Sequence, residues 1–137
     1  AAQLGEFLRY HPSLGPPLSE FAILVVARHW DSEFEWCQHA RIALESGVSA
    51  DIVAAVQANR RPERMDERQA LVHDFAHALL ERHRVPDALY QRARELLGVK
   101  GVVELTGLIG YYTFIALTLL AHEVPLPSGA GPQLPPK

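Results

Sequence analysis

Apolar residues recur at helical spacing through most of the chain, and this pattern predicts an all-α protein. The predicted helices cover residues 1–10, 18–30, 32–47, 50–59, 66–83, 86–97 and 101–122. Prolines and a glycine predict a loop over residues 11–17, and a second proline-rich stretch predicts an extended tail over residues 125–137. We therefore expect one domain, residues 1–124, folded as a compact bundle of six to seven helices around a central helical hairpin.

The stretch 32–47 carries the most informative polar positions. On a helix of about 100° per residue, Glu35, Trp36 and His39 share one broad face, and Cys37 lies on the opposite, apolar face. A helix that is apolar on two sides is buried on two sides, so we expect Glu35 and His39 to lie in a largely dry crevice. A carboxylate one turn before an imidazole can fix its tautomer and raise its pKa, which leaves a proton donor or acceptor usable near neutral pH. This pair is the candidate catalytic site.

The preceding helix, residues 18–30, is apolar all round over most of its length, which predicts a central position in the core. A tight turn joins it to the next helix, so the resulting hairpin could bring Glu20 and Arg28 near His39. From the residues alone, Glu20 is better interpreted as a carboxylate in a first helical turn, which favours the helix dipole. Arg28 is a candidate clamp for a substrate carboxylate, because a guanidinium binds one bidentately.

Aromatic residues complete the candidate site. Trp36 shares its face with His39, and we interpret it as a wall of a substrate pocket. Tyr111 is a further candidate for substrate binding. Alternatively, Tyr111 and Tyr112 pack in the core with their hydroxyl groups hydrogen-bonded.

These residues belong to a longer pattern: Glu20, Ala27-Arg28-His29-Trp30, Glu35-Trp36, His39, Gly47, Glu104-Leu105, Gly110-Tyr111-Tyr112 and Val124-Pro125-Leu126-Pro127. The pattern spans nearly the whole chain and resembles the carboxymuconolactone decarboxylase family, which includes the alkylhydroperoxidase D-like (AhpD-like) proteins. The peroxidase branch of that family carries a C-x-x-C motif that ends four residues before this histidine. Ser32 and Glu35 occupy those two positions here, so the chain resembles the decarboxylase branch, with its E-W-x-x-H form.

The resemblance implies an AhpD-like fold, a homo-oligomer that is commonly trimeric or hexameric, and a lyase-like enzyme for a small carboxylated lactone or related acid. Loss of CO2 leaves an electron pair that a conjugated carbonyl must accept, and a proton must then be delivered. His39 is the expected donor, oriented and charge-stabilised by Glu35 or Glu20. Two alternatives stay open. One is a thiol-dependent peroxidase that uses Cys37 with an external resolving thiol, and the other is a non-catalytic oligomeric binding protein.

Two sets of residues raise the question of a metal. The segment from His73 to His77 is similar to the H-E-x-x-H zinc signature, but its central acid is an aspartate, which reaches less far, and no third ligand is identifiable. Glu20, Glu35 and His39 are also of ligand type, but a di-iron bundle core supplies Glu-x-x-His from two helices, and neither copy is present. We therefore predict no metal and no cofactor.

Composition narrows the class further. The chain has 137 residues, 21% charged, with a net charge of −3, which is ordinary for a globular domain and gives no reason to expect nucleic acid. Its one cysteine fits a reducing compartment, and no signal peptide is visible, so we expect a cytoplasmic protein. The uncharged run 105–121 has seventeen residues, slightly short of the roughly twenty that span a bilayer. We therefore predict a core helix, partly at a subunit interface, and no membrane partner.

Overall fold

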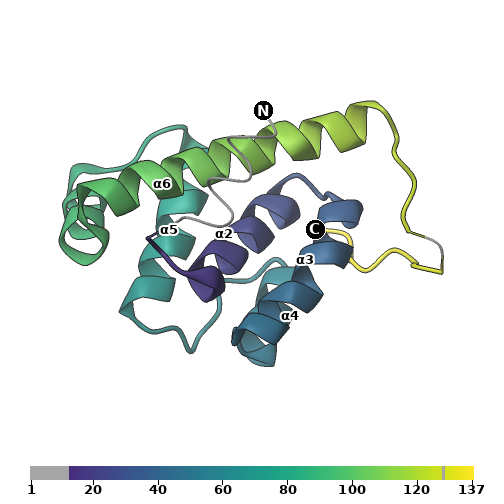
Figure 1. Ribbon diagram of the computed structural model, residues 1–137, viewed down its shortest axis with the longest axis horizontal. Helices are drawn as coiled ribbons and strands as arrows, with labels where there is room; N and C mark the ends of the chain where they lie inside the picture. Colours follow the sequence, from purple (N-terminus) through teal and green to yellow (C-terminus); the bar gives the residue numbers. More distant parts are fainter. Residues whose placement is uncertain (1–12, 128) are drawn as a thin grey trace.

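The computed structural model describes residues 13–127 and 129–137, and in these residues it contains five α-helices and no strand (Figure 1). The helices are α2 (Pro16–His29), α3 (Glu33–Ser46), α4 (Ala50–Gln57), α5 (Glu67–Arg82) and α6 (Asp87–Ala121). The predicted all-α class is confirmed, whereas the helix predicted over residues 1–10 lies outside the described residues. Helix α2 begins two residues before the predicted start, because proline is well suited to the first turn of a helix.

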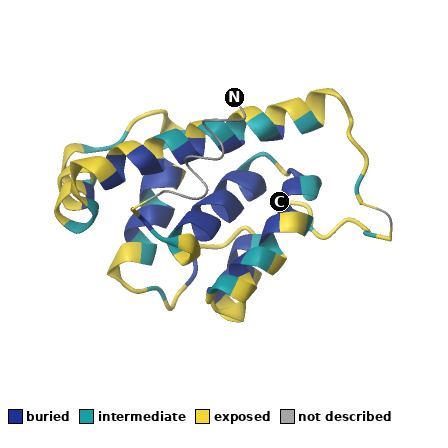
Figure 2. Cartoon of the chain, in the orientation of Figure 1, coloured by how far each residue is buried: buried dark blue, intermediate teal, exposed yellow. Residues whose placement is uncertain are grey.

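Helix α2 is the centre of the fold. It packs against all four other helices, and the side chains from Phe21 to Ala27 are between 0% and 7% exposed. Figure 2 shows α2 buried along nearly its whole length. This placement follows from its sequence, because a helix that is apolar all round must be covered on every side. Any functional group on α2 is consequently positioned by the core itself.

The ends of three helices follow directly from local sequence. Gly47 ends α3 with a φ of 111°, a left-handed conformation that glycine adopts without steric cost. The Ser49 hydroxyl accepts a hydrogen bond from the Ile52 backbone N–H at 3.2 Å, as expected of an N-cap. Asp66 and Gln69 form both hydrogen bonds of a capping box, at 2.8 and 3.0 Å, at the start of α5. These local interactions fix where α3 ends and where α4 and α5 begin.

The two helices predicted over residues 86–97 and 101–122 form the two segments of α6. They meet at a kink at Gly98, where φ is 73° and the backbone is not helical. Beyond the kink, one face buries residues such as Leu105 and Leu108, while the other leaves Val103 65% and Phe114 52% exposed. By length and composition α6 is able to cross a membrane, but core helices of soluble proteins pass the same test.

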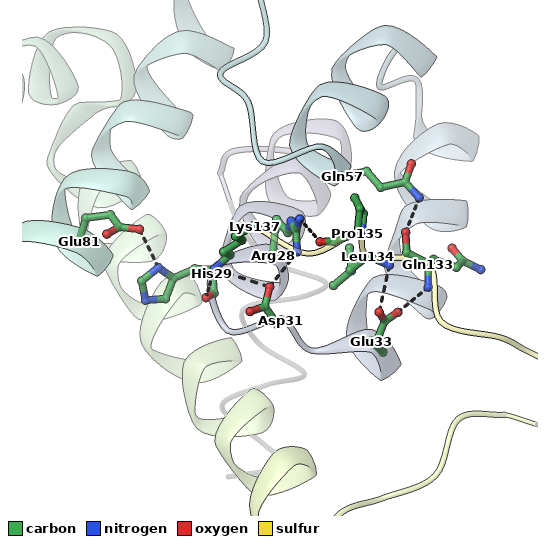
Figure 3. A network of polar contacts seen from close by, with 10 residues as sticks. All are labelled: Arg28, His29, Asp31, Glu33, Gln57, Glu81, Gln133, Leu134, Pro135 and Lys137. Carbon is green, nitrogen blue, oxygen red and sulfur yellow. Dashed lines mark hydrogen bonds and ion pairs between the residues drawn. The ribbon is translucent and has the colours of Figure 1, made fainter.

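The proline-rich tail folds back onto its own chain (Figures 1 and 3). The backbone N–H groups of Gln133 and Leu134 donate to the two carboxylate oxygens of Glu33, at 2.8 and 2.9 Å. The Gln57 amide donates to the Gln133 carbonyl at 2.8 Å. Lys137 Nζ donates to the His29 carbonyl at 2.9 Å. The end of the chain is therefore tied to α2, α3 and α4, in keeping with the predicted extended course over the surface.

Candidate acid–base site

Three predicted site residues meet in the core and form what we call the acid–base triad: Glu20, Glu35 and His39. His39 Nδ1 lies 2.7 Å from Glu20 Oε2, and His39 Nε2 lies 3.1 Å from Glu35 Oε2. Glu35 and His39 are one turn apart on α3, whereas Glu20 comes from α2 across the hairpin. The exposed fractions are 6%, 4% and 3% for the three residues in chain order. The hairpin thus brings both carboxylates to the same imidazole ring, as the sequence predicted.

The two carboxylates keep the ring charged. Burial by itself would lower the pKa of His39, but the hydrogen bonds to Glu20 and Glu35 and their negative charges outweigh it and raise the pKa to about 9. At neutral pH the ring is therefore an imidazolium whose two N–H groups each donate to a carboxylate. Such a group holds a proton that it can transfer when a stronger base develops beside it.

An aromatic ring from α6 lies against the triad. The Tyr112 ring lies edge-on to the His39 ring, with centroids 5.4 Å apart at an angle of 82°, and Trp36 is buried at 1% exposure. Tyr111 is one step further away, at 5.3 Å from the Tyr112 ring. From the sequence, Tyr111 was the candidate for substrate binding and Tyr112 was expected to pack, yet Tyr112 is the tyrosine whose ring lies against His39. The apolar stripe through Leu105, Leu108 and Ile109 was the available signal, because helical spacing places Tyr112 on that buried face.

Arg28 lies elsewhere. Its Nη1 donates to Asp31 at 2.8 Å, and its Nη2 donates to the Pro135 carbonyl of the tail at 2.7 Å (Figure 3). Its Nε is buried and has no hydrogen-bond partner among the described residues. Arg28 is eight residues after Glu20, which corresponds to about 12 Å along a helix at ~1.5 Å per residue. The hairpin therefore brings Glu20 to His39 but does not bring Arg28 there. Arg28 could bind only a carboxylate that lies away from the His39 ring.

The triad is closed in the single chain. The described residues form four surface cavities of note, and these four are not lined by Glu20, Glu35 or His39. Within the described ranges, no group of three or more His, Cys, Asp or Glu side chains is arranged to hold a metal ion. Cys37 is a half-buried free thiol on α3, and no polar contact between it and the triad is found in the described part of the chain. The arrangement is suited to holding and moving one proton.

The chain was also compared with known families, proteins and structures. No family model, no curated protein and no solved structure matches the chain. The fold class and the geometry of the triad are therefore the grounds for assigning a function.

Proposed function

We propose that the chain is a carboxymuconolactone decarboxylase-like enzyme that processes a small carboxylated lactone or related acid. In this proposal it has an AhpD-like bundle of six to seven helices, acts in the cytoplasm as a trimer or hexamer, and needs no cofactor. The observation that carries the proposal is the buried contact of His39 with both Glu20 and Glu35. A ring that stays protonated at neutral pH inside a water-poor core is what a proton-donating step requires.

The proposed reaction begins with cleavage of the bond between the substrate carbon and its carboxylate. CO2 leaves, and the electron pair moves into a conjugated carbonyl to give an enolate. The Nε2–H of His39, which makes the longer of the two contacts with a carboxylate, then turns from Glu35 to protonate the carbon, and the ring recovers a proton from solvent after product release. Glu20 and Glu35 hold the ring in position and stabilise its charge, as carboxylates do in other histidine-centred sites.

Substrate must reach a ring that is covered in the isolated chain. Tyr112 lies against the edge of His39, so we propose that substrate enters where α6 meets α3, by displacing this side chain. Trp36 then provides an apolar wall, which favours the loss of a charged carboxylate as neutral CO2. This entry route keeps water away from the enolate until it is protonated.

The test is a panel of decarboxylation and peroxide-consumption assays on the wild type, His39→Gln and Cys37→Ser. Positioned proton transfer contributes about 10²–10⁴-fold to rate, so His39→Gln should reduce decarboxylation at least a hundredfold. His122→Gln is the matched control, because His122 is exposed at the end of α6. Decarboxylation that survives in His39→Gln would contradict the proposal. Peroxide consumption that disappears in Cys37→Ser would instead support the thiol peroxidase.

A non-catalytic oligomeric binding protein is a second candidate, favoured by the outer face of α6. This face exposes Val99 at 60%, Val103 at 65%, Phe114 at 52% and Leu117 at 46%. At about 100° per residue these four positions lie within about 60° of one another on the helix, so they form one exposed apolar stripe of the kind that packs against another helix. Light scattering on Val103→Glu tests for an interface of this kind. A dissociated variant, together with a panel inactive in the wild type, would favour this second candidate over the enzyme.

A further inference from the structure

A second polar site lies away from the triad, in a cavity of ≈ 300 Å³ between α2, α4, α5 and the loop that follows α4. Part of its wall is apolar and comes from Val25, Val56 and Leu80. Small-molecule sites usually combine such a lining with a few convergent polar groups, and this volume is at the lower end of their range. The cavity is therefore large enough for a compact organic molecule. We call it the Arg60–His73 cavity.

The charged side chains that line the cavity are Arg28, Arg60, Arg61, Asp74 and Glu81. Both carboxylates are already engaged. Asp74 accepts two hydrogen bonds from Arg61, at 3.1 and 3.0 Å, and Glu81 contacts His29 Nδ1 at 3.2 Å (Figure 3). Arg60 has no acidic partner among the residues that the structure describes. The group complementary to its free guanidinium is an anion.

Arg28 also lines the cavity, but its charge is paired. It is only 3% exposed, and its guanidinium donates to the Asp31 carboxylate and to the Pro135 carbonyl of the tail. Figure 3 shows the guanidinium between these two partners. Among the charged side chains that line the cavity, the guanidinium left for an anion is therefore that of Arg60.

His73 supplies a hydrogen-bond acceptor. Its Nδ1 lies 3.0 Å from Asp74 Oδ1, and burial lowers the pKa of His73 despite this contact. The ring is therefore neutral at pH 7, with its proton on Nδ1, and Nε2 carries a lone pair. The His77 ring stacks in parallel on it, at 5.8 Å and 10°. His73 and His77 both line the cavity, so Nε2 is the one acceptor that the His73 ring can offer to a ligand there.

We propose that the Arg60–His73 cavity binds a small carboxylic acid that also carries a hydroxyl group. The carboxylate pairs with Arg60, and the hydroxyl donates to His73 Nε2. The carbon body lies against the apolar wall. Because the cavity shares no residue with the acid–base triad, this binding is independent of the proposed enzymatic reaction.

Mandelate is the probe, since it combines a carboxylate, a hydroxyl group and one flat ring. Phenylacetate lacks the hydroxyl group, and benzyl alcohol lacks the carboxylate. Isothermal titration calorimetry should give the tightest binding for mandelate. Loss of a charge-assisted hydrogen bond typically weakens binding about tenfold or more. Arg60→Gln should therefore lower the affinity for mandelate by about that factor. His73→Leu should remove the preference for mandelate over phenylacetate.

Arg64→Gln is the matched control, because Arg64 is exposed in the same loop but does not line this cavity. Mandelate affinity should be unchanged in this variant. Absence of mandelate binding to the wild type would overturn the proposal, as would equal affinity in the wild type and Arg60→Gln. Arg60 is exposed, so its variant should fold normally and the test does not depend on His73→Leu.

Discussion

The acid–base triad and the Arg60–His73 cavity each contain a histidine that packs against α2. The pKa of this histidine is raised in the triad and lowered in the cavity. His39 contacts two carboxylates, and its pKa rises to about 9. His73 contacts one, Asp74, which is itself neutralised by Arg61, and burial lowers the pKa of His73. Burial lowers the pKa of either ring by itself. The number of carboxylates left without another cation therefore decides whether a buried ring is charged.

This difference separates two kinds of chemistry within one small fold. The triad holds a proton in a closed core, which suits a donor. The cavity is lined by the buried, neutral His73 ring and by the exposed, unpaired guanidinium of Arg60, which suits binding. The four predictions that follow test this contrast, from the largest expected effect to the smallest.

Replacing His39 by leucine should have the largest effect. Without the imidazolium, two buried carboxylates face each other, and removing one partner of a buried ion pair typically costs about 3–5 kcal/mol. Urea denaturation at pH 7 should show a fall of that size in the free energy of unfolding. His77→Leu is the control, because His77 is exposed in the cavity and its loss should change stability by about 0.5 kcal/mol or less. Equal effects of the two variants would contradict a charged triad.

The stability of the wild type should depend on pH through His39. Its pKa is about 9 in the folded chain against an unperturbed 6.5. The stabilisation is therefore fully present below pH 6.5 and is lost as pH rises through 9. A shift of this size corresponds to about 3 kcal/mol. Denaturation curves from pH 6 to pH 10 should show this fall in the wild type relative to His39→Gln. Parallel curves would show that the pKa is not raised.

Removing residues 132–137 should have an intermediate effect. The truncation takes away the Pro135 carbonyl that Arg28 Nη2 contacts, together with the half-buried Leu134. Leaving a buried donor unsatisfied costs about 1–3 kcal/mol, and thermal unfolding should detect the loss. The control is Lys137→Ala, which removes only an exposed contact. A truncated chain as stable as the control would mean that the tail does not hold Arg28.

The smallest effect on stability is expected for Arg61→Gln. The Arg61–Asp74 pair is largely exposed, so its loss should cost about 0.2–1 kcal/mol. The variant nevertheless leaves Asp74 without a cation, so the pKa of His73 should rise toward that of a ring beside a free carboxylate. NMR titration of the His73 ring measures this shift, with Arg64→Gln as control. An unchanged His73 titration would contradict the role given to Arg61.

Much of the triad was predictable because it depends on short-range geometry. The spacing of Glu35 and His39 puts them one turn apart on any helix, and the apolar flanks of α3 predict burial. Glu20 followed once a tight turn was expected between α2 and α3. The helix ends were predictable for the same reason, because Gly47 and the Asp66 capping box act within a few residues.

Other features could not be predicted because they depend on contacts distant in sequence. Arg28 binds the Pro135 carbonyl 107 residues away, and no local pattern indicates where an extended tail will lie. The Arg60–His73 cavity requires a loop arginine to meet α5, and the sequence there suggested only the connection between two predicted helices and a zinc-like motif without a third ligand.

The most direct test of the central claim is the protonation state of His39 at neutral pH. Two-dimensional 15N–1H NMR of the histidine rings, compared with His39→Gln for assignment, reports whether each ring nitrogen carries a proton. We expect both nitrogens of His39 to be protonated at pH 7.5 and the ring to titrate near 9. A neutral His39 ring at pH 7.5, titrating at or below 6.5, would contradict the account.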